Sequence, residues 1–417
     1  MLLDDTDYPE DWPIMHLDRI AQRGSGHTPS KSHPEYWNGN IKWVSLADSY
    51  RLDAGYIFDT DKKISLEGIK NSSAVVHPAE TVILSRDAGV GKSGITKEAM
   101  AVSQHFIAWN CNQTDKILPW FLYYTLQFHQ KELERQAVGS TIKTIGLPFF
   151  KNLEIALPPL PEQKKIAAIL STWDRAIEGT EKLLANSQQQ KKALMQQLLT
   201  GKKRLPGFMG EWKIHRLSDF FVRLMQRNIS GNTNVVTISA QDGLVKQEEY
   251  FKKIVASDTL DGYFLLENGD FAYNKSYSIG YPMGAIKRLN RYDEGVVTPL
   301  YICFRLKPHY ITNGDFFEFY FDSGLMNYKL TQIAHEGGRA HGLLNVKPAD
   351  FMDLQIIVPS VDEQKAIAAV LTTADKEIAT IKSDLSRLRD EKKALMQQLL
   401  TGKRRVKVDQ EISDTGL

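Results

Sequence analysis

The stretch KKALMQQLLTGK at residues 191–202 decides the fold, because the same residues return at 392–403. The two copies lie 201 residues apart in a chain of 417. Extended without a gap, residues 158–204 match residues 359–405 with 25 identities in 47 positions. A long period with only two units indicates a tandem duplication whose halves form a pseudo-symmetric pair, not a solenoid.

Each copy predicts one long helix. In the second copy, apolar residues recur at alternating steps of four and three over nearly five heptads, with one lapse at Lys392. The first copy keeps this rhythm with polar lapses at Thr180, Ser187 and Lys191. An a/d rhythm of this length is typical of a coiled-coil seam.

The ends of both helices are readable in the sequence. Ser360 and Glu363 have the spacing of a capping box, and Pro161 suits a first helical turn. Gly201 and Gly402 stand where a left-handed C-terminal cap is expected. We therefore expect about 40 residues in each helix.

Such a seam also occurs in homodimerising zippers and in unrelated surface helices. Two copies of one seam in a single chain most simply pack against each other. The pair is expected to be antiparallel, because residues 205–358 separate the end of the first copy from the start of the second. We predict an α+β fold with two mixed α/β domains separated by two long helices that form an antiparallel coiled coil, in a pseudo-two-fold internal repeat. The residues expected at this spacer or at a partner interface are Glu162, Gln163, Ile166, Leu170, Ile177, Leu194, Leu198, Glu363, Gln364, Ile367, Leu371, Ile378, Leu385, Leu395 and Leu399.

The predicted domains diverge far more than the helices do. Trp12 and Leu17 align with Trp212 and Leu217, and both domains end in an apolar strand that runs into proline. Between these ends, β-like runs alternate with helical stretches, which is typical of a mixed domain. The expected domains are 1–157 and 205–358, the spacer helices 158–204 and 359–405, and the tail 406–417; β-like runs are expected at 42–46, 81–85, 235–239 and 296–306, and helical stretches at 118–134 and 315–330. Two unlike domains on one repeated scaffold indicate two related tasks on different targets.

The composition is that of an ordinary globular chain, with 42% hydrophobic and 24% charged residues. No signal peptide stands out and no apolar run reaches the roughly 18 residues of a membrane helix, so we expect a cytoplasmic protein without a membrane partner. Cys111 and Cys303 are too few for a disulfide framework and stand in apolar surroundings. A net charge of +2 neither supports nor excludes nucleic acid, so any DNA-binding surface must be a local patch.

Residues 87–93 resemble a phosphate-binding loop, since Gly91-Lys92-Ser93 follows a β-like run. The motif fails because it needs a glycine five residues before Gly91, where this chain has Arg86. We interpret the segment as a turn that presents Arg86, Lys92 and Ser93 to a phosphate or a base edge. A P-loop nucleotide hydrolase is the weaker alternative.

No methyltransferase, nuclease or metal-binding motif stands out, so no catalytic residue, metal or cofactor of this chain is expected. Three loops instead carry side chains that could reach DNA: 24–31 in the first domain, beside an aromatic cluster, and 273–280 and 335–342 in the second. The loops of the second domain suit base reading, because Asn pairs with adenine and Arg or Lys with guanine. Beside the loop of the first domain, Tyr36, Trp37 and Trp43 are expected in the core. The candidate DNA-contacting residues are Ser25, Thr28, Ser30, Lys31, Arg86, Lys92, Ser93, Asn274, Lys275, Tyr277, Arg339 and His341.

Over essentially its whole length, the chain resembles the specificity subunit of type I restriction-modification systems. The resemblance is carried by PPLPEQKKIA at 158–167, which leads to LLTGK at 198–202, and by the second copies of both at 359–368 and 399–403. The first domain adds TPS at 28–30 and EYWNG at 35–39. The second domain lacks these elements and has NKSY at 274–277, which indicates a different subclass of recognition domain and a different target.

The resemblance implies that each domain binds one half of a split, asymmetric site in double-stranded DNA. Half-sites read by a pseudo-symmetric pair are expected about one DNA turn, roughly 34 to 36 Å, apart. The family also implies two modification subunits that use S-adenosylmethionine, and restriction subunits that use ATP and Mg, in a bacterium or archaeon. No catalytic site on this chain is then required.

Several hypotheses follow for the spacer. An insertion of four residues after Gly179 is predicted to shift the separation of the half-sites.

The competing functions are a coiled-coil scaffold without sequence-specific DNA binding, and the P-loop hydrolase. We hypothesise that the cations at the helix ends contact phosphate or a partner subunit, with simple solvation as the alternative. These cations are Lys191, Lys192, Lys202, Lys203 and Arg204.

Overall fold

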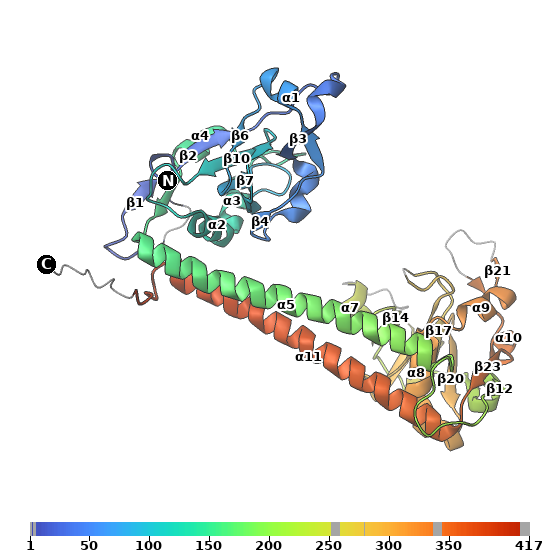
Figure 1. Ribbon diagram of the computed structural model, residues 1–417. Helices are drawn as coiled ribbons and strands as arrows, with labels where there is room; N and C mark the ends of the chain where they lie inside the picture. Colours follow the sequence, from blue (N-terminus) through green and yellow to red (C-terminus); the bar gives the residue numbers. More distant parts are fainter. Residues whose placement is uncertain (1, 3–5, 252–258, 279, 337–343, 409–417) are drawn as a thin grey trace. The chain divides into compact units, whose positions relative to one another are not determined.

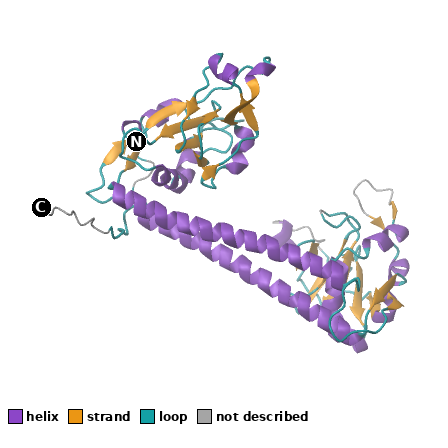
Figure 2. Ribbon diagram, in the orientation of Figure 1, coloured by secondary structure: helices purple, strands orange, loops and turns teal. Residues whose placement is uncertain are grey.

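The structure, a computed structural model, describes residues 2, 6–251, 259–278, 280–336 and 344–408. The chain divides into two compact units: a first unit of residues 1–181 and 384–417, and a second unit of residues 182–383. Helices and strands are mixed in both units, as Figure 2 shows. The predicted α+β class is confirmed.

Two sheets form the core of the first unit. The strand bounds are β1 Ile14–His16, β2 Gln22–Ser25, β3 Trp37–Val44, β4 Tyr56–Ile57, β5 Lys62–Ile64, β6 Val76–His77, β7 Thr81–Ser85, β8 Ser93–Thr96, β9 Met100–Val102, β10 Phe106–Asn110 and β11 Glu154–Ala156. One sheet has the order β2-β10-β7-β8-β4 and the other β5-β3-β9-β6, while β1 pairs with β11. Every residue of β7 is buried, because its apolar and β-branched residues lie inside the domain with both faces covered.

Short helices close the first unit. Their bounds are α1 Leu66–Lys70, α2 Pro119–Phe128, α3 Gln130–Gln136 and α4 Leu147–Lys151, with 3-10 turns at Leu17–Arg19, Pro34–Tyr36 and Leu46–Arg51. Helix α2 begins with proline at its first position, where the missing N–H costs nothing. It buries Phe121, Tyr123 and Tyr124 in the core.

The second unit is built around a four-stranded sheet of order β13-β20-β17-β18. The strand bounds are β12 Lys213–Arg216, β13 Phe221–Leu224, β14 Val236–Ser239, β15 Gly243–Lys246, β16 Phe264–Glu267, β17 Phe271–Asn274, β18 Ala285–Arg288, β19 Glu294–Val297, β20 Ile302–Leu306, β21 His335–Glu336, β22 Leu344–Asn345 and β23 Gln355–Val358. The helices are α6 Leu217–Phe220, α7 Gln247–Phe251, α8 Gly314–Asp322, α9 Asn327–Ile333 and α10 Pro348–Met352, with a 3-10 turn at Pro308–Asn313. Phe271 and Phe304 stack with ring centroids 5.5 Å apart in the centre of this core.

Two helices of 39 residues each, α5 (Leu160–Leu198) and α11 (Val361–Leu399), contribute to both units. In the first unit, Leu170 near the start of α5 shares a core with Leu399 at the end of α11. In the second unit, Leu198 at the end of α5 shares a core with Leu371 near the start of α11. In each unit the helices therefore lie side by side and antiparallel (Figure 1), as predicted.

The helix ends follow the sequence signals with one exception. Gly201 and Gly402 adopt φ of +69° and +70°, which confirms both left-handed caps. At the start of α11, the Ser360 hydroxyl accepts a 3.4 Å hydrogen bond from the Glu363 N–H. The other half of the predicted capping box is wrong, because the Glu363 carboxylate binds Arg204 instead.

Three expected segments are interrupted in the structure. The run 296–306 is two strands, since the Tyr301 N–H bonds the Thr298 carbonyl in a turn. The stretch 118–134 breaks into two helices at His129, and 315–330 breaks near Gly324, whose φ is +79°. The run 42–46 begins earlier and ends sooner, as β3.

Candidate nucleic-acid interface

Three loops of the first unit meet at one edge: the loop after β2, the turn between β9 and β10, and the turn between β7 and β8. The His27 N–H bonds the Val102 carbonyl at 3.1 Å, which ties the first loop to the second. A Cβ on Gly26 would lie 1.8 Å from the Val102 oxygen, so only glycine permits this approach. The Arg86 N–H bonds the His105 carbonyl at 2.9 Å and ties the second loop to the third.

A chain of side chains runs across these loops. The Thr28 hydroxyl donates to the Gln104 amide oxygen, and the Gln104 Nε2 lies 3.4 Å from His105 Nε2. His105 Nδ1 lies 2.8 Å from the Asp87 carboxylate, which favours the tautomer with its proton on Nδ1. Gln104 is exposed and keeps one amide hydrogen and one oxygen lone pair free. We name Thr28, Asp87, Gln104 and His105 the first polar edge.

The turn between β7 and β8 is not a phosphate-binding loop. β7 and β8 pair antiparallel as a hairpin, so no helix follows the strand as the P-loop requires. Arg86 donates from Nε to the Ile145 carbonyl at 3.1 Å, and Lys92 is half-buried. Ser93 is fully buried and its hydroxyl accepts from Gln127 at 2.9 Å, so we withdraw Ser93 as a DNA contact.

The remaining candidates of the first unit lie on or beside the loop after β2. Ser25, Ser30 and Lys31 are exposed. Trp37 and Trp43 belong to the small core below this loop, and their indole N–H groups donate to the carbonyls of Ser30 and His27 at 3.1 and 3.0 Å. The indoles therefore support the loop instead of reading bases.

In the second unit, Asn274, Lys275 and Tyr277 lie at the end of β17. The Asn274 side-chain oxygen accepts the Ser276 N–H at 3.1 Å, and Tyr277 is 63% exposed. Burial lowers the pKa of Lys275, and the positive charge of Arg223 on β13 lowers it further. Two cations that face no carboxylate partner within the described residues suit an anion such as a phosphate. We name Arg223, Asn274, Lys275 and Tyr277 the second polar edge.

The other two candidates of the second unit, Arg339 and His341, lie outside the described residues.

The expected spacer residues lie at the helix pair. Those buried are Glu162, Gln163, Ile166, Leu170, Leu198, Glu363, Gln364, Ile367, Leu371, Ile378, Leu385 and Leu399, and those partly buried are Ile177, Leu194 and Leu395. The two glutamines do not face the opposite helix. Gln163 donates to the carbonyls of Lys116 and Pro158, and Gln364 donates to that of Pro359, so each glutamine fastens its helix to the preceding domain.

Two of the helix-end cations have partners inside the chain. Arg204 forms a bidentate pair with Glu363 at 2.6 and 2.7 Å. Lys191 pairs with Asp375 at 2.5 Å. These two side chains are therefore not merely solvated, whereas Lys192, Lys202 and Lys203 are exposed. Contact of the helix-end cations with phosphate or a partner subunit stays a prediction.

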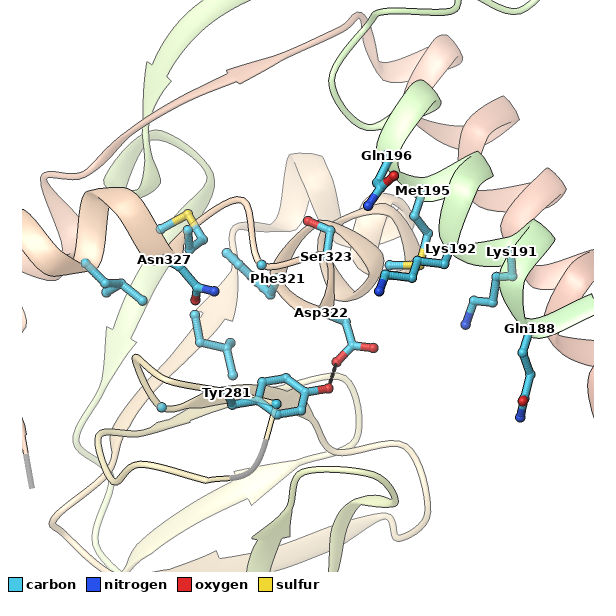
Figure 3. Close-up of a pocket in the computed structure, with 16 residues that line it drawn as sticks. Gln188, Lys191, Lys192, Met195, Gln196, Tyr281, Phe321, Asp322, Ser323 and Asn327 are labelled. Carbon is cyan, nitrogen blue, oxygen red and sulfur yellow. Dashed lines mark hydrogen bonds between the residues drawn. The ribbon is translucent and has the colours of Figure 1, made fainter. Parts of the chain in front are cut away.

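A hollow of 360 Å³ lies in the second unit between the last turns of α5 and the domain (Figure 3). Two of the polar side chains that line it, Tyr281 and Asp322, are paired with each other. The Tyr281 hydroxyl donates to Asp322 at 2.6 Å, and Lys287 donates to the Tyr281 oxygen at 2.9 Å. Burial and Asp322 raise the pKa of Tyr281, which keeps the phenol protonated. The closed triad of Tyr281, Asp322 and Lys287 stabilises this junction.

Sequence reasoning missed Gln104, His105 and Arg223. Each stands singly in a turn or strand without a motif around it. A glutamine in a turn after a strand gave the only available signal, and that signal is weak.

Comparisons with known proteins agree with this architecture. The family described as type I restriction modification DNA specificity domain matches residues 9–186. The MjaVIII specificity subunit of Methanocaldococcus jannaschii is 24% identical over 424 residues, which cover 96% of this chain and 94% of the relative. The MjaIX specificity subunit of the same organism is 30% identical over 179 residues, and the chain spans only 40% of its length. The S subunit of a type I system from M. genitalium has the same fold, with a TM-score of 0.54 at 14% identity, covering 95% of this chain and 96% of that one.

Residues 9–186 match the family of type I restriction modification DNA specificity domains, and over nearly its whole length the chain is similar to specificity subunits of type I systems. A specificity subunit is the sequence-specific DNA-recognition component of its complex and is non-catalytic. This role fits the two polar edges. Within the described residues, no group of three His, Cys, Asp or Glu side chains has a metal-binding arrangement, and no helix is long and apolar enough to cross a membrane.

Proposed function

We propose that the two domains of this specificity subunit read the two halves of one bipartite, asymmetric DNA site, and that the helix pair sets the distance between them. The observation that carries the proposal is the contrast between the polar edges. The first offers Thr28 and the amide of Gln104, whereas the second offers Asn274 and the paired cations Arg223 and Lys275. Different donor and acceptor sets on a repeated scaffold suit different base sequences.

The subunit acts within a larger complex in the bacterial or archaeal cytoplasm. We infer two modification subunits, because the chain repeats its own helix ends and so offers the same docking surface twice. These subunits supply S-adenosylmethionine, and restriction subunits supply ATP and Mg. The chain binds double-stranded DNA and contributes no reacting group.

The target is found by mapping methylated adenines across the genome of cells that carry this chain with its modification subunits. We expect one split motif with two unlike halves. A continuous motif, or methylation that persists when the chain is deleted, would contradict the proposal.

The spacer is tested by lengthening both helices at matching positions. Glu181 of α5 pairs with Arg389 of α11, so seven residues inserted after Gly179 and seven after Arg387 keep the seam in phase. At 1.5 Å per residue this adds about 10 Å, or about three base pairs. We expect both halves unchanged and the gap longer by about that amount. The insertion of four residues after Gly179 alone is also predicted to shift the separation, but it lengthens one helix only and breaks the heptad phase. An unchanged site would count against the spacer role.

A further inference from the structure

The hairpin 138–144 of the first unit belongs to no candidate named above. The Val138 N–H bonds the Thr144 carbonyl at 3.1 Å, and the Thr144 N–H bonds the Val138 carbonyl at 2.9 Å. Its turn depends on Gly139, whose φ is +134° and where a Cβ would lie 2.3 Å from the Ile142 oxygen. The hairpin therefore has a defined shape that only glycine permits at that position.

The base of the hairpin is fixed to the first polar edge. The backbone of Thr144 forms an antiparallel β-bridge with Asp87. The carboxylate of Asp87 in turn lies 2.8 Å from His105 Nδ1. The Ile145 N–H bonds the Arg86 carbonyl at 2.8 Å, and Ile145 itself is buried in the core. A ligand that lies on the edge would thus meet the hairpin at a fixed offset.

The hairpin presents aliphatic side chains to solvent. At the base of the hairpin Val138 is 74% exposed, and towards the tip Ile142 is 63% exposed, beside exposed Ser140, Thr141 and Lys143. A hollow of 390 Å³ separates Ile142 from Val90 of the neighbouring turn. Leaving both aliphatic side chains in water contributes nothing to folding, so the fold does not explain them.

The surroundings of the tip favour a polyanion. Arg86, Lys92 and Lys143 lie on the hairpin or on the turn beside it, and none of them forms an ion pair within the described residues. Glu134 lines the same hollow, and Asp87 is engaged by His105. Exposed aliphatic side chains flanked by cations suit a duplex groove, where apolar side chains pack on base edges and cations bind phosphates.

The second unit has a hairpin at the matching position. β21 pairs with β22 directly before buried Val346 and Phe351, which correspond to buried Ile145 and Phe150. The paired residues of the two hairpins differ in sequence, Val138 and Thr144 in the first and His335 and Asn345 in the second. Unlike hairpins at a matching position suit two different targets.

We propose that the hairpin 138–144 is a groove-contacting finger of the first domain, in which Val138 and Ile142 pack on base surfaces and Lys143 pairs with a phosphate. The proposal rests on the function proposed above and adds residues to its first half-site.

The test measures binding of the assembled complex to a duplex that carries the mapped site and to one with the first half shuffled, over a range of salt concentrations. Val138→Ser with Ile142→Ser should weaken cognate binding by about tenfold and leave shuffled binding unchanged. The slope of log K against log salt should not change, since an apolar contact releases no counterion. Lys143→Ala should weaken binding to both duplexes and reduce the slope by about one.

Two further variants separate the finger from general damage. Gly139→Ala keeps both aliphatic side chains but distorts the turn, and should lose cognate affinity as the double variant does. Leu66→Ser removes a side chain that is 70% exposed on α1 and should leave binding unchanged.

Cognate binding by the double variant equal to wild type would overturn the finger while leaving the proposed function intact. Loss of the modification subunits with no loss of DNA contact would assign the hairpin to protein docking and also overturn it. Wild-type complex that does not distinguish the two duplexes would overturn both proposals.

Discussion

The two units differ most in the polar edges of their domains and are most alike at the ends of the long helices. In the first unit, Arg405 follows the glycine cap of α11, binds Glu162 in the first turn of α5 and lies 5.6 Å from the ring of Trp12. In the second unit, Arg204 follows the cap of α5, binds Glu363 and lies 5.8 Å from Trp212. We name these the first and second clasps.

A second pair of matching contacts joins each domain to the helices. Lys392 pairs with Asp174 and lies over the ring of Tyr124, 5.4 Å from its centroid, while the Tyr124 hydroxyl donates to Asp174 at 2.7 Å. The counterparts in the second unit are Lys191, Asp375 and Phe319, with a cation-to-ring distance of 5.2 Å. The phenylalanine has no hydroxyl, so the second contact lacks one hydrogen bond.

These matches explain where the duplication retained its sequence. Within the helices, identities crowd at both ends, whereas 178–190 and 379–391 share only Leu184 with Leu385. The clasps account for part of this retention, because loss of Arg204 or Arg405 would leave the buried carboxylate of Glu363 or Glu162 unpaired. The polar edges are under no such constraint and have diverged.

The largest expected effect tests the clasps against each other. Arg204→Met leaves Glu363, whose side chain is 2% exposed, without a counterion and should cost about 3 kcal/mol of unfolding free energy. Arg405→Met leaves Glu162, 11% exposed, and Asp11, 57% exposed, and should cost about 1 to 2 kcal/mol. Denaturant unfolding of the full chain gives the totals, and hydrogen exchange locates the loss in one unit.

Arg135→Met is the matched control, because Arg135 is 74% exposed and its pair with Glu132 should contribute less than about 0.5 kcal/mol. Adding Glu363→Gln to Arg204→Met should recover part of the loss. Equal costs for the two clasps would show that burial of the carboxylate does not set their strength.

The next effect concerns the hydroxyl that only the first unit has. Tyr124→Phe makes the first contact resemble the second and should cost about 1 kcal/mol, the usual contribution of one hydrogen bond. Burial, reinforced by Asp174, raises the pKa of Tyr124, so the hydroxyl donates at every ordinary pH. A double-mutant cycle with Asp174→Asn should give a coupling energy of about 1 kcal/mol. Strictly additive effects would mean that the hydroxyl bond contributes nothing to stability.

The fold was predictable where a pattern repeats along the chain, and the interface was not. The heptad rhythm and Gly201 and Gly402 are local signals, and they placed both helices and their caps. Gln104 gave no signal, because its contact with Thr28 joins segments far apart in the sequence. Ser93 looked accessible in a glycine-rich turn, yet pairing of β7 with β8 buries it. Arg204 looked solvated because its partner, Glu363, stands 159 residues away.

The smallest expected effect separates the domains by pH. His77 on β6 is buried beside Gly24, and burial lowers its pKa, an effect only partly opposed by a hydrogen bond with the Ser25 backbone. In the unfolded chain His77 binds a proton below its ordinary pKa of 6.5, whereas in the folded chain it binds that proton less readily. Acidification therefore lowers the free energy of unfolding. In the second unit, burial raises the pKa of Asp270 and Glu318, so acid favours their folded, protonated forms.

Acidification from pH 7 to pH 5 should therefore lower the hydrogen-exchange protection factors, corrected for the intrinsic pH dependence of exchange, in the first unit and not in the second. The expected loss is small, because a hydrogen bond with the Ser25 backbone partly opposes the effect of burial. His77→Gln should remove this acid sensitivity, while His309→Gln in the second unit should change nothing. If the first unit of His77→Gln still loosens in acid as the wild type does, another group in that unit is titrating, and the contrast between the two domains must be assigned to that group.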